Sequence, residues 1–282
     1  MKKIVFCGFG KLGKDCLERL IDEGYTISFI FTHKELQEES VDTFAKMKNL
    51  EYCYKDARKY LDEVKPRIIQ LRPDYLVSVN YRYIIPREIF EIPKFAINIH
   101  GSLLPKYRGR TPHVWSIING EEYSGITAHI IEETVDTGDI IAQIPVKIDP
   151  NDTGYSLLKK FEGLYPDLLI NSINKLENNE PLLKQNENNA SFFGKRTPEM
   201  GYIDFYKESY EIINFVRAQA HPYPGAYYYL IDGKKIIINR LIVEESISLN
   251  LPIGVITNIN NDYYVKCKDN VLKIVDYKIV NY

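Results

Sequence analysis

Two polar side chains on one predicted strand are the first candidates for chemistry. The segment AINIHG contains Asn98 and His100, which share one face of a strand because side chains alternate, while Ile97 and Ile99 pack on the other face. An imidazole can transfer a proton near neutral pH, and an amide N–H can hold negative charge that develops on an oxygen. An isolated Asn-x-His pair would favour a structural role, in which both side chains satisfy the Gly-Ser-Leu-Leu-Pro loop that follows. Further residues are needed before a catalytic role is favoured over this structural role.

An acidic loop further along the chain supplies such residues. EETVDTGD, residues 132–139, contains Asp136 and Asp139 between two predicted strands. A carboxylate beside an imidazole raises its basicity and fixes its tautomer. Together with an amide, these groups are sufficient to transfer an acyl group to an amine. The alternative interpretation of the loop is a solvated acidic turn.

The N-terminal segment GFGKLG, residues 8–13, matches the Gly-x-Gly-x-x-Gly pattern of dinucleotide-binding turns. A dinucleotide site also requires an Asp or Glu at the end of the second strand, where it holds a ribose hydroxyl. Residues 32–34 at that place are Thr, His and Lys, so the pattern disfavours a nicotinamide enzyme. The simplest interpretation is a tight turn. In another, the backbone around Gly10 and the positive end of the following helix hold a substrate phosphate, and Lys11 adds charge.

The elements that position these residues alternate between strand and helix over the first hundred residues. We expect strands at residues 3–7, 25–33, 74–80 and 94–100, and helices at residues 14–24, 39–48 and 58–71. This alternation predicts an α/β fold with a Rossmann-like, doubly wound parallel sheet. Ligands of such sheets bind at the carboxyl ends of the strands, where Asn98 and His100 are expected.

The second half of the chain changes in character. Residues 125–147 are predicted to form two strands around the acidic loop, and residues 150–179 one helix capped by Asp152 or Thr153. A polar, Asn-rich connector follows, then a helix at 208–220 and short strands at regular spacing. We therefore expect a large domain at residues 1–190, a connector at 191–204 and a smaller, antiparallel, OB-like β domain at 205–282.

Composition limits the class of protein. The chain of 282 residues is 45% hydrophobic with a formal net charge of -2, which gives no reason to expect nucleic acid or a membrane as a partner. Four cysteines without paired spacing predict reduced thiols and no metal site. The N-terminal apolar run is too short for a signal sequence or a membrane span. We expect a soluble, cytoplasmic protein.

An ordered set of motifs carries a family resemblance. NIHGSLLPKYRGRTP begins at Asn98 and is followed by NGE, SGITAH and DTGDIIAQ, with compatible spacing over most of residues 1–190. The set resembles the 10-formyltetrahydrofolate-dependent formyltransferase family, whose members act on glycinamide ribonucleotide, methionyl-tRNA or nucleotide-linked amino sugars. The resemblance implies that Asn98, His100 and Asp136 are catalytic, and Asp136 is chosen over Asp139 because it is the first acid of DTGD.

The resemblance also implies a mechanism. A neutral amine attacks the formyl carbon of 10-formyltetrahydrofolate while Asn98 holds the oxyanion. His100 shares that role or takes the amine proton, and Asp136 orients His100. Tetrahydrofolate then leaves, and no metal takes part.

By the same resemblance, the folate co-substrate lies against the segment NYRYIIP. Arg82, Tyr83 and Ile84 form one wall of its pocket, and Thr134 and Val135 lie opposite. Without the resemblance, the segment would be interpreted as a buried turn between a strand and a helix.

Three features favour a nucleotide-linked amino sugar as the amine. Gly101 follows the histidine where the glycinamide ribonucleotide and methionyl-tRNA enzymes carry Pro. Residues 205–282 hold nine Lys or Arg against eight Asp or Glu, which disfavours tRNA as a partner. GKRTP at 194–198 and FVRAQAHPYPGA at 215–226 are similar to the enzyme that formylates UDP-4-amino-4-deoxyarabinose. They are also similar to enzymes that act on dTDP- or GDP-linked amino sugars for surface polysaccharides.

A nucleotide sugar requires partners for its diphosphate and a surface for its base. The predicted diphosphate contacts are Gly10, Lys11, Arg110 and Arg196. The other histidines are interpreted as packed or surface residues, namely His33, His113, His129 and His221. A homodimer that covers the apolar strands of the C-terminal sheet is also predicted. The alternatives are a methionyl-tRNA formyltransferase or, in different chemistry, a dinucleotide-binding oxidoreductase.

Overall fold

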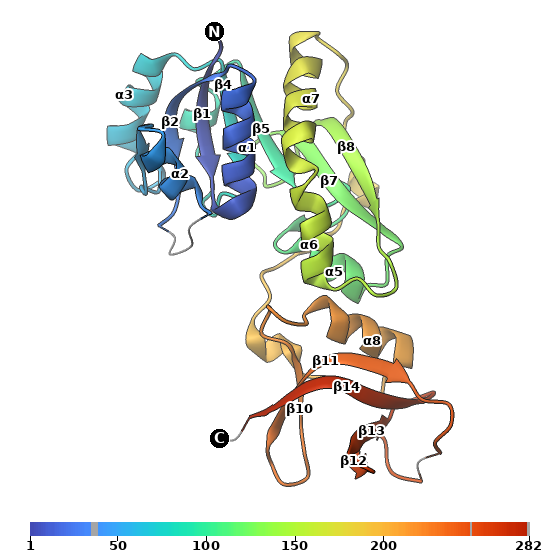
Figure 1. Cartoon of the computed structure of the whole chain (residues 1–282). Coiled ribbons are helices and arrows are strands. Elements are labelled where there is room, and N and C mark those ends of the chain that lie inside the picture. The colour runs from blue at the N-terminus through green and yellow to red at the C-terminus, as the bar shows by residue number, and fades with distance from the viewer. Residues whose placement is uncertain (35–38, 249, 281–282) are drawn as a thin grey trace. The chain divides into compact units, whose positions relative to one another are not determined.

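The computed structural model describes residues 1–34, 39–248 and 250–280 (Figure 1). Contacts between residues divide the chain into two compact units. The first unit contains Met1–Gly109, Gly125–Pro145 and Phe161–Phe192, and the second contains Arg110–Ser124, Val146–Lys160 and Phe193–Tyr282. The domain boundaries drawn from the sequence, at 190 and 205, remain a prediction.

A seven-stranded sheet organises the first unit, in the order β3-β2-β1-β4-β5-β7-β8. Its strands are β1 (Lys3–Gly8), β2 (Thr26–Phe31), β3 (Tyr52–Cys53), β4 (Tyr75–Val79), β5 (Phe95–His100), β7 (Tyr123–Ile130) and β8 (Ile140–Lys147). The pairs from β3 to β5 are parallel, which confirms the Rossmann-like α/β prediction. Beyond β5 the sheet becomes mixed, because β7 pairs antiparallel with β5. The strand order reverses between β1 and β4, and ligands of such sheets bind beside this point.

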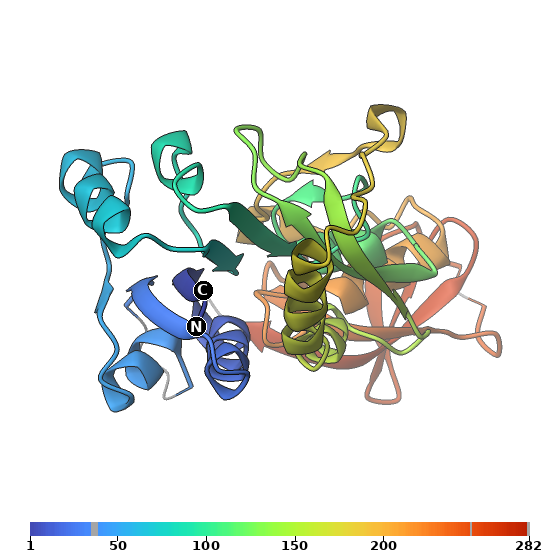
Figure 2. The ribbon, with the colours of Figure 1, turned by 90° about the horizontal axis from the view of Figure 1, so that it is seen from above.

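Helices cover both faces of this sheet (Figure 2). They are α1 (Gly10–Asp22), α2 (Val41–Met47), α3 (Leu61–Leu71) and α4 (Arg87–Phe90). Figure 2 shows α3 and α4 on one face and α1 and α2 on the other. Along α1, Leu12, Cys16, Leu17 and Leu20 are buried, a spacing that turns one helical face to the sheet. The helix ends before Gly24, whose φ of 84° suits glycine.

The predicted helix at 150–179 is two helices, α6 (Gly154–Glu162) and α7 (Tyr165–Glu177). Pro166 lies in the first turn of α7. Proline has no N–H and its ring clashes with the preceding turn, so a continuous helix is interrupted here. Thr153 provides the predicted cap, because its Oγ1 accepts from the Ser156 N–H at 3.1 Å.

The second unit contains the predicted antiparallel sheet. It has five strands in the order β10-β11-β14-β13-β12. Its strands are β10 (Ala226–Tyr229), β11 (Lys235–Val243), β12 (Ile256–Ile259), β13 (Asp262–Lys266) and β14 (Val271–Val280). Helix α8 (Ser209–Ala218) contacts β11 and also α5 (Pro112–Ile118). Val216 of α8 packs in a buried cluster with Ile236 and Ile238 of β11, so one face of the sheet is covered.

Short elements lie in and beside the segment interpreted as a connector. They are β6 (Arg108–Gly109), β9 (Phe192–Phe193) and two 3₁₀ helices, η1 (Glu187–Asn189) and η2 (Pro198–Gly201). The segment therefore carries defined local structure. Across the described ranges, no helix has the length and apolar character needed to cross a membrane.

Candidate active site

The polar residues predicted on one strand lie at the carboxyl end of β5. In the register of the sheet, Asn98 is opposite Ser78 of β4 and His129 of β7, and His100 is opposite Thr127. Asn98 is half-buried and His100 is buried. Side chains of residues that are opposite one another point to the same face, so Asn98, His100 and His129 form a cluster.

His129 was interpreted as a packed or surface residue, and the structure adds it to this cluster. Its Nδ1 is 2.8 Å from the backbone oxygen of Ile130, which can only accept, so Nδ1 donates. Its Nε2 then accepts from the Asn98 amide nitrogen at 3.1 Å. An amide nitrogen carries two hydrogens, so Asn98 retains one for a further acceptor. The alternation of residues in SGITAHI indicates that His129 could lie on a buried face of its strand. The sequence does not reveal that His129 lies opposite Asn98 of β5.

The imidazole of His100 is held by the chain that follows it. Its Nε2 donates to the backbone oxygen of Tyr107 at 2.7 Å. Its Nδ1 is therefore the nitrogen that can gain a proton, and it lies 3.5 Å from Oδ2 of Asp136. A proton taken by His100 is thus stabilised by a carboxylate.

Asp136 is buried, and its two carboxylate oxygens face different partners. Oδ2 accepts from the Gly109 N–H at 2.9 Å, and Oδ1 lies 3.5 Å from His129 Nε2. Burial by itself raises the pKa of this carboxyl, but His100 and His129, when protonated, and the Gly109 N–H stabilise the carboxylate, and the net pKa is well below its usual range. Asp139, the other acid of the loop, contributes its backbone oxygen to the Ile130 N–H at 3.0 Å.

The segment predicted as one folate wall packs on His33. The backbone N–H of Arg82 donates to His33 Nε2 at 3.1 Å, and the Arg82 guanidinium lies 3.7 Å from the centre of the Phe9 ring. Tyr83 meets the His33 ring edge-on, with 4.5 Å between ring centres. Burial and the Arg82 charge lower the pKa of His33, which favours the neutral ring. Ile84 is 53% exposed.

The segment predicted as the opposite wall lies beside the first. Arg87, at the start of α4, is 4.0 Å from the carboxylate of Glu133. The next two residues are Thr134, whose backbone oxygen accepts from Thr137 Oγ1 at 2.9 Å, and Val135, which is 39% exposed. Both predicted walls thus present an exposed apolar side chain, and the second leads directly to Asp136.

The residues predicted to bind phosphate have different surroundings in the two units. In the first, Gly10 begins α1 with φ of 62°, and Lys11 Nζ is 2.7 Å from Asp15 and 3.8 Å from Glu39. The charge of Lys11 is therefore shared with acids of its own unit.

In the second unit, Arg110 is exposed, whereas Arg196 is packed. The Arg196 guanidinium lies 4.7 Å from the Trp115 ring centre and 5.5 Å from that of Phe215, and it donates to Gln219 Oε1 at 3.1 Å. Burial lowers the pKa of Arg196. These contacts indicate that Arg196 stabilises the second unit.

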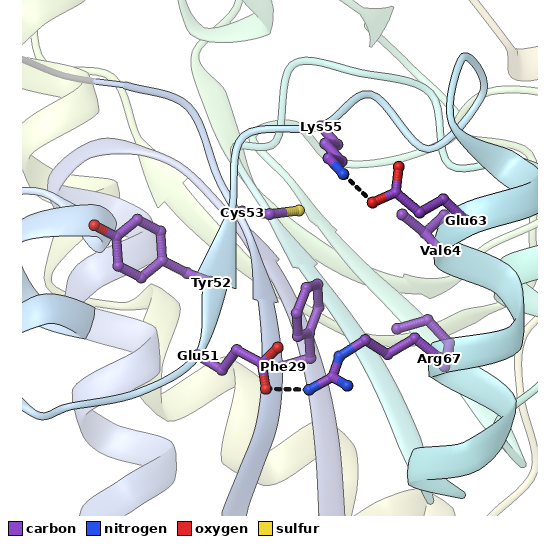
Figure 3. A pocket seen from close by; sticks show the side chains of 9 residues that line it. Phe29, Glu51, Tyr52, Cys53, Lys55, Glu63, Val64 and Arg67 are labelled. Atoms are coloured by element: carbon purple, nitrogen blue, oxygen red, sulfur yellow. Dashed lines mark hydrogen bonds and ion pairs between the residues drawn. The ribbon is translucent and has the colours of Figure 1, made fainter.

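A pocket of about 240 Å³ lies elsewhere, at the β3 edge of the large sheet (Figure 3). It is lined by Phe29, Glu51, Tyr52, Cys53, Lys55, Glu63, Val64, Arg67 and Ile68. Figure 3 shows its charged side chains joined in two pairs, Lys55 with Glu63 and Glu51 with Arg67. None of the predicted site residues lines this pocket. Among the residues that the structure describes, no group of three or more His, Cys, Asp or Glu could hold a metal ion.

Comparison with known proteins assigns the chain to a family. The model for formyl transferases matches residues 2–173, and the model for the formyl transferase C-terminal domain matches residues 195–280. The chain is 34% identical to the bifunctional polymyxin resistance protein ArnA of Wigglesworthia glossinidia brevipalpis, over 98% of this chain but only 42% of that protein. It is 32% identical to a methionyl-tRNA formyltransferase of Caldanaerobacter subterraneus subsp. tengcongensis, over 97% of this chain and 91% of that protein.

A solved structure has the same fold along its whole length. It is an N-formyltransferase from Helicobacter canadensis in complex with folinic acid and dTDP-3-aminofucose, with a TM-score of 0.77 and 21% identity. The match covers 99% of this chain and 100% of that chain. Since a family model spans more than half of the sequence and a relative of similar length is over 30% identical, the chain belongs to the formyl transferase family and is a transferase.

Proposed function

We propose that this protein transfers the formyl group of 10-formyltetrahydrofolate to the amine of a nucleotide-linked amino-deoxy sugar. The observation that carries the proposal is the cluster of Asn98, His100 and Asp136 at the carboxyl end of β5, in a chain of the formyl transferase family. The chain spans less than half of the length of its ArnA relative. Membership of the formyl transferase family disfavours the alternative of a dinucleotide-binding oxidoreductase.

The geometry supports a direct transfer. Asn98 donates one amide hydrogen to His129 and uses the other to hold the oxyanion that forms when the amine attacks the formyl carbon. His100 takes the amine proton at Nδ1, because its Nε2 is already bound to Tyr107. It returns this proton to N10 of the folate as the bond between N10 and the formyl carbon breaks and tetrahydrofolate leaves. Asp136 stays ionised and stabilises the imidazolium.

The residues proposed to bind folate offer apolar and aromatic side chains to the faces of its flat rings. Ile84 and Val135 expose apolar side chains on two segments that the Arg87–Glu133 contact brings together. Arg82 and Tyr83 are held in place by the neutral ring of His33. When bound, 10-formyltetrahydrofolate supplies the activated formyl group, and the chain supplies binding, the oxyanion partner and the base.

The amine is proposed to belong to a dTDP-, UDP- or GDP-linked sugar used for surface polysaccharide. The solved N-formyltransferase was crystallised with dTDP-3-aminofucose and folinic acid, which supports this choice. The methionyl-tRNA formyltransferase relative supports the second candidate, formylation of initiator methionyl-tRNA. The charge balance of residues 205–282 favours the sugar, since a tRNA partner requires a basic surface.

We also propose a cytoplasmic location and a homodimer that uses the C-terminal sheet. Cys7, Cys16, Cys53 and Cys267 are all free thiols, in keeping with a reducing compartment.

The decisive experiment offers both amines to the purified protein. With 10-formyltetrahydrofolate and a panel of dTDP-, UDP- and GDP-linked amino sugars, we expect an N-formyl sugar nucleotide by mass spectrometry. Formylation of initiator methionyl-tRNA without any sugar product would overturn the proposed substrate. His100→Ala should lower kcat by on the order of 10²-fold or more at an unchanged melting temperature, and a fully active variant would remove His100 from the mechanism.

A further inference from the structure

The side chain of Gln185 reaches the loop that carries Asp136. Gln185 lies in the polar segment after α7, which sequence patterns give no role beyond connection. Its amide nitrogen donates to the backbone oxygen of Asp136 at 2.9 Å and to that of Gly138 at 2.7 Å. One side chain from a distant part of the chain therefore holds two carbonyl groups of the acidic loop.

This loop requires such support because its backbone is strained. Asp136 has φ of 60°, in the left-handed region that is unfavourable for a residue with a Cβ. Gly138 is pressed so closely against β7 that an added Cβ would lie 1.9 Å from the oxygen of Ile130. The end of β7 thus confines the loop at Gly138, and Gln185 donates hydrogen bonds to the backbone oxygens of Asp136 and Gly138.

Arg108 fixes which way the Gln185 amide faces. The guanidinium donates through Nε and Nη2 to Gln185 Oε1, at 3.2 and 2.7 Å, so the amide oxygen faces arginine and the amide nitrogen faces the loop. Arg108 is 3% exposed, and Glu187 at the surface accepts two further bonds from it, at 2.8 and 2.7 Å. A buried guanidinium that makes four hydrogen bonds is a rigid anchor. The next residue, Gly109, donates to the Asp136 carboxylate itself.

We propose that Gln185, oriented by Arg108, is a positioning residue that holds the Asp136 carboxylate toward His100 during formyl transfer. The inference rests on the proposed catalytic role of Asp136. Gln185 makes its hydrogen bonds with the loop through backbone oxygens, so its effect on the reaction passes through Asp136. Without the two hydrogen bonds from Gln185, Asp136 is no longer held in its left-handed conformation. Its carboxylate is then no longer kept 3.5 Å from Nδ1 of His100.

The test replaces Gln185 by methionine, which has similar length and no hydrogen-bonding amide. Gln185→Met should lower kcat about 10- to 50-fold while the KM values for folate and amine change less than about 2-fold, since only the chemical step depends on Asp136. Gln70→Met on α3, an exposed glutamine, is the matched control and should retain wild-type kinetics. If Gln185→Met does not fold, Arg108→Lys tests the same point, because lysine cannot make the two-pronged contact with Gln185.

A double mutant separates positioning from a merely structural effect. In an Asp136→Asn background, Gln185→Met should cause no further fall in kcat, because the group it positions has already lost its charge. The inference would be overturned if the fall in kcat of the double mutant equalled the product of the falls in the two single mutants. Wild-type kcat in Gln185→Met would overturn it as well. Wild-type kcat in Asp136→Asn alone would instead overturn the proposed mechanism, so the two failures are distinguishable.

Discussion

Asp136 links the chemistry of the site to the stability of the fold. Burial opposes ionisation, but its pKa is lowered in the folded state, because His100 and His129, when protonated, and the Gly109 N–H stabilise the carboxylate. A lowered pKa means that the folded state binds fewer protons than the unfolded state, so the stabilisation is present above the unfolded pKa of about 3.9 and is lost below it. The melting temperature of the wild type should therefore exceed that of Asp136→Asn most clearly above about pH 5.

Thermal unfolding of both proteins between pH 3 and pH 7 measures this effect. The gap between the two melting temperatures should narrow as the pH falls through about 4. A gap that is constant with pH, or that widens on acidification, would show that the Asp136 carboxylate is not stabilised in the folded protein.

Residue patterns revealed part of this cluster before the structure did. Strand alternation placed Asn98 and His100 on one face, and the family motif selected Asp136. The roles of His129 and Gln185 could not be predicted from the sequence. The position of His129 depends on the register of β7 against β5, and that of Gln185 on the path of the chain after α7. Long-range pairing of this kind leaves no periodic trace in the sequence.

The connection between β7 and β8 is the element that carries Asp136, and Gly138 is its tightest point. An alanine Cβ there would lie 1.9 Å from the Ile130 oxygen, so the loop or the end of β7 must move. We expect Gly138→Ala to lower kcat by at least about 10-fold and the unfolding free energy by about 1–3 kcal/mol.

The matched control for that substitution is Gly194→Ala, where no atom lies within 4 Å of the added Cβ. It should change the unfolding free energy by less than about 0.5 kcal/mol. Circular dichroism melts and steady-state kinetics on both variants make the comparison. Equal behaviour of the two alanine variants would mean that the loop adapts without cost and that its position is not tightly defined.

Elements were predictable where local patterns decide them. The parallel strands from β1 to β5 follow from buried apolar runs between helical segments, and Gly24 ends α1 as expected. The direction of β7 and the division of residues 150–179 into two helices were not foreseen. The first depends on how the chain re-enters the sheet, and the second on one proline within an otherwise continuous apolar pattern.

At the scale of the molecule, the second unit has a sheet with exposed apolar side chains on two of its inner strands, β11 and β14. Helix α8 covers the side that contains Ile236 and Leu272. Apolar side chains of β11 and β14 are nevertheless 36–42% exposed, namely Ile242, Val243, Val275 and Tyr277. Exposed apolar side chains on neighbouring strands can support association.

We therefore predict that light scattering will give twice the chain mass of 32.8 kDa for the wild type and the monomer mass for Val275→Glu, because a buried, unpaired carboxylate opposes association. Met47→Glu on α2, at a position 69% exposed, is the control and should leave the wild-type mass unchanged. A monomeric wild type, or a dimeric Val275→Glu, would contradict this assembly. Asn98, His100 and Asp136 all belong to the first unit, so the monomeric variant should keep its kcat within about 2-fold. If its activity is lost, the second protomer must contribute to the reaction.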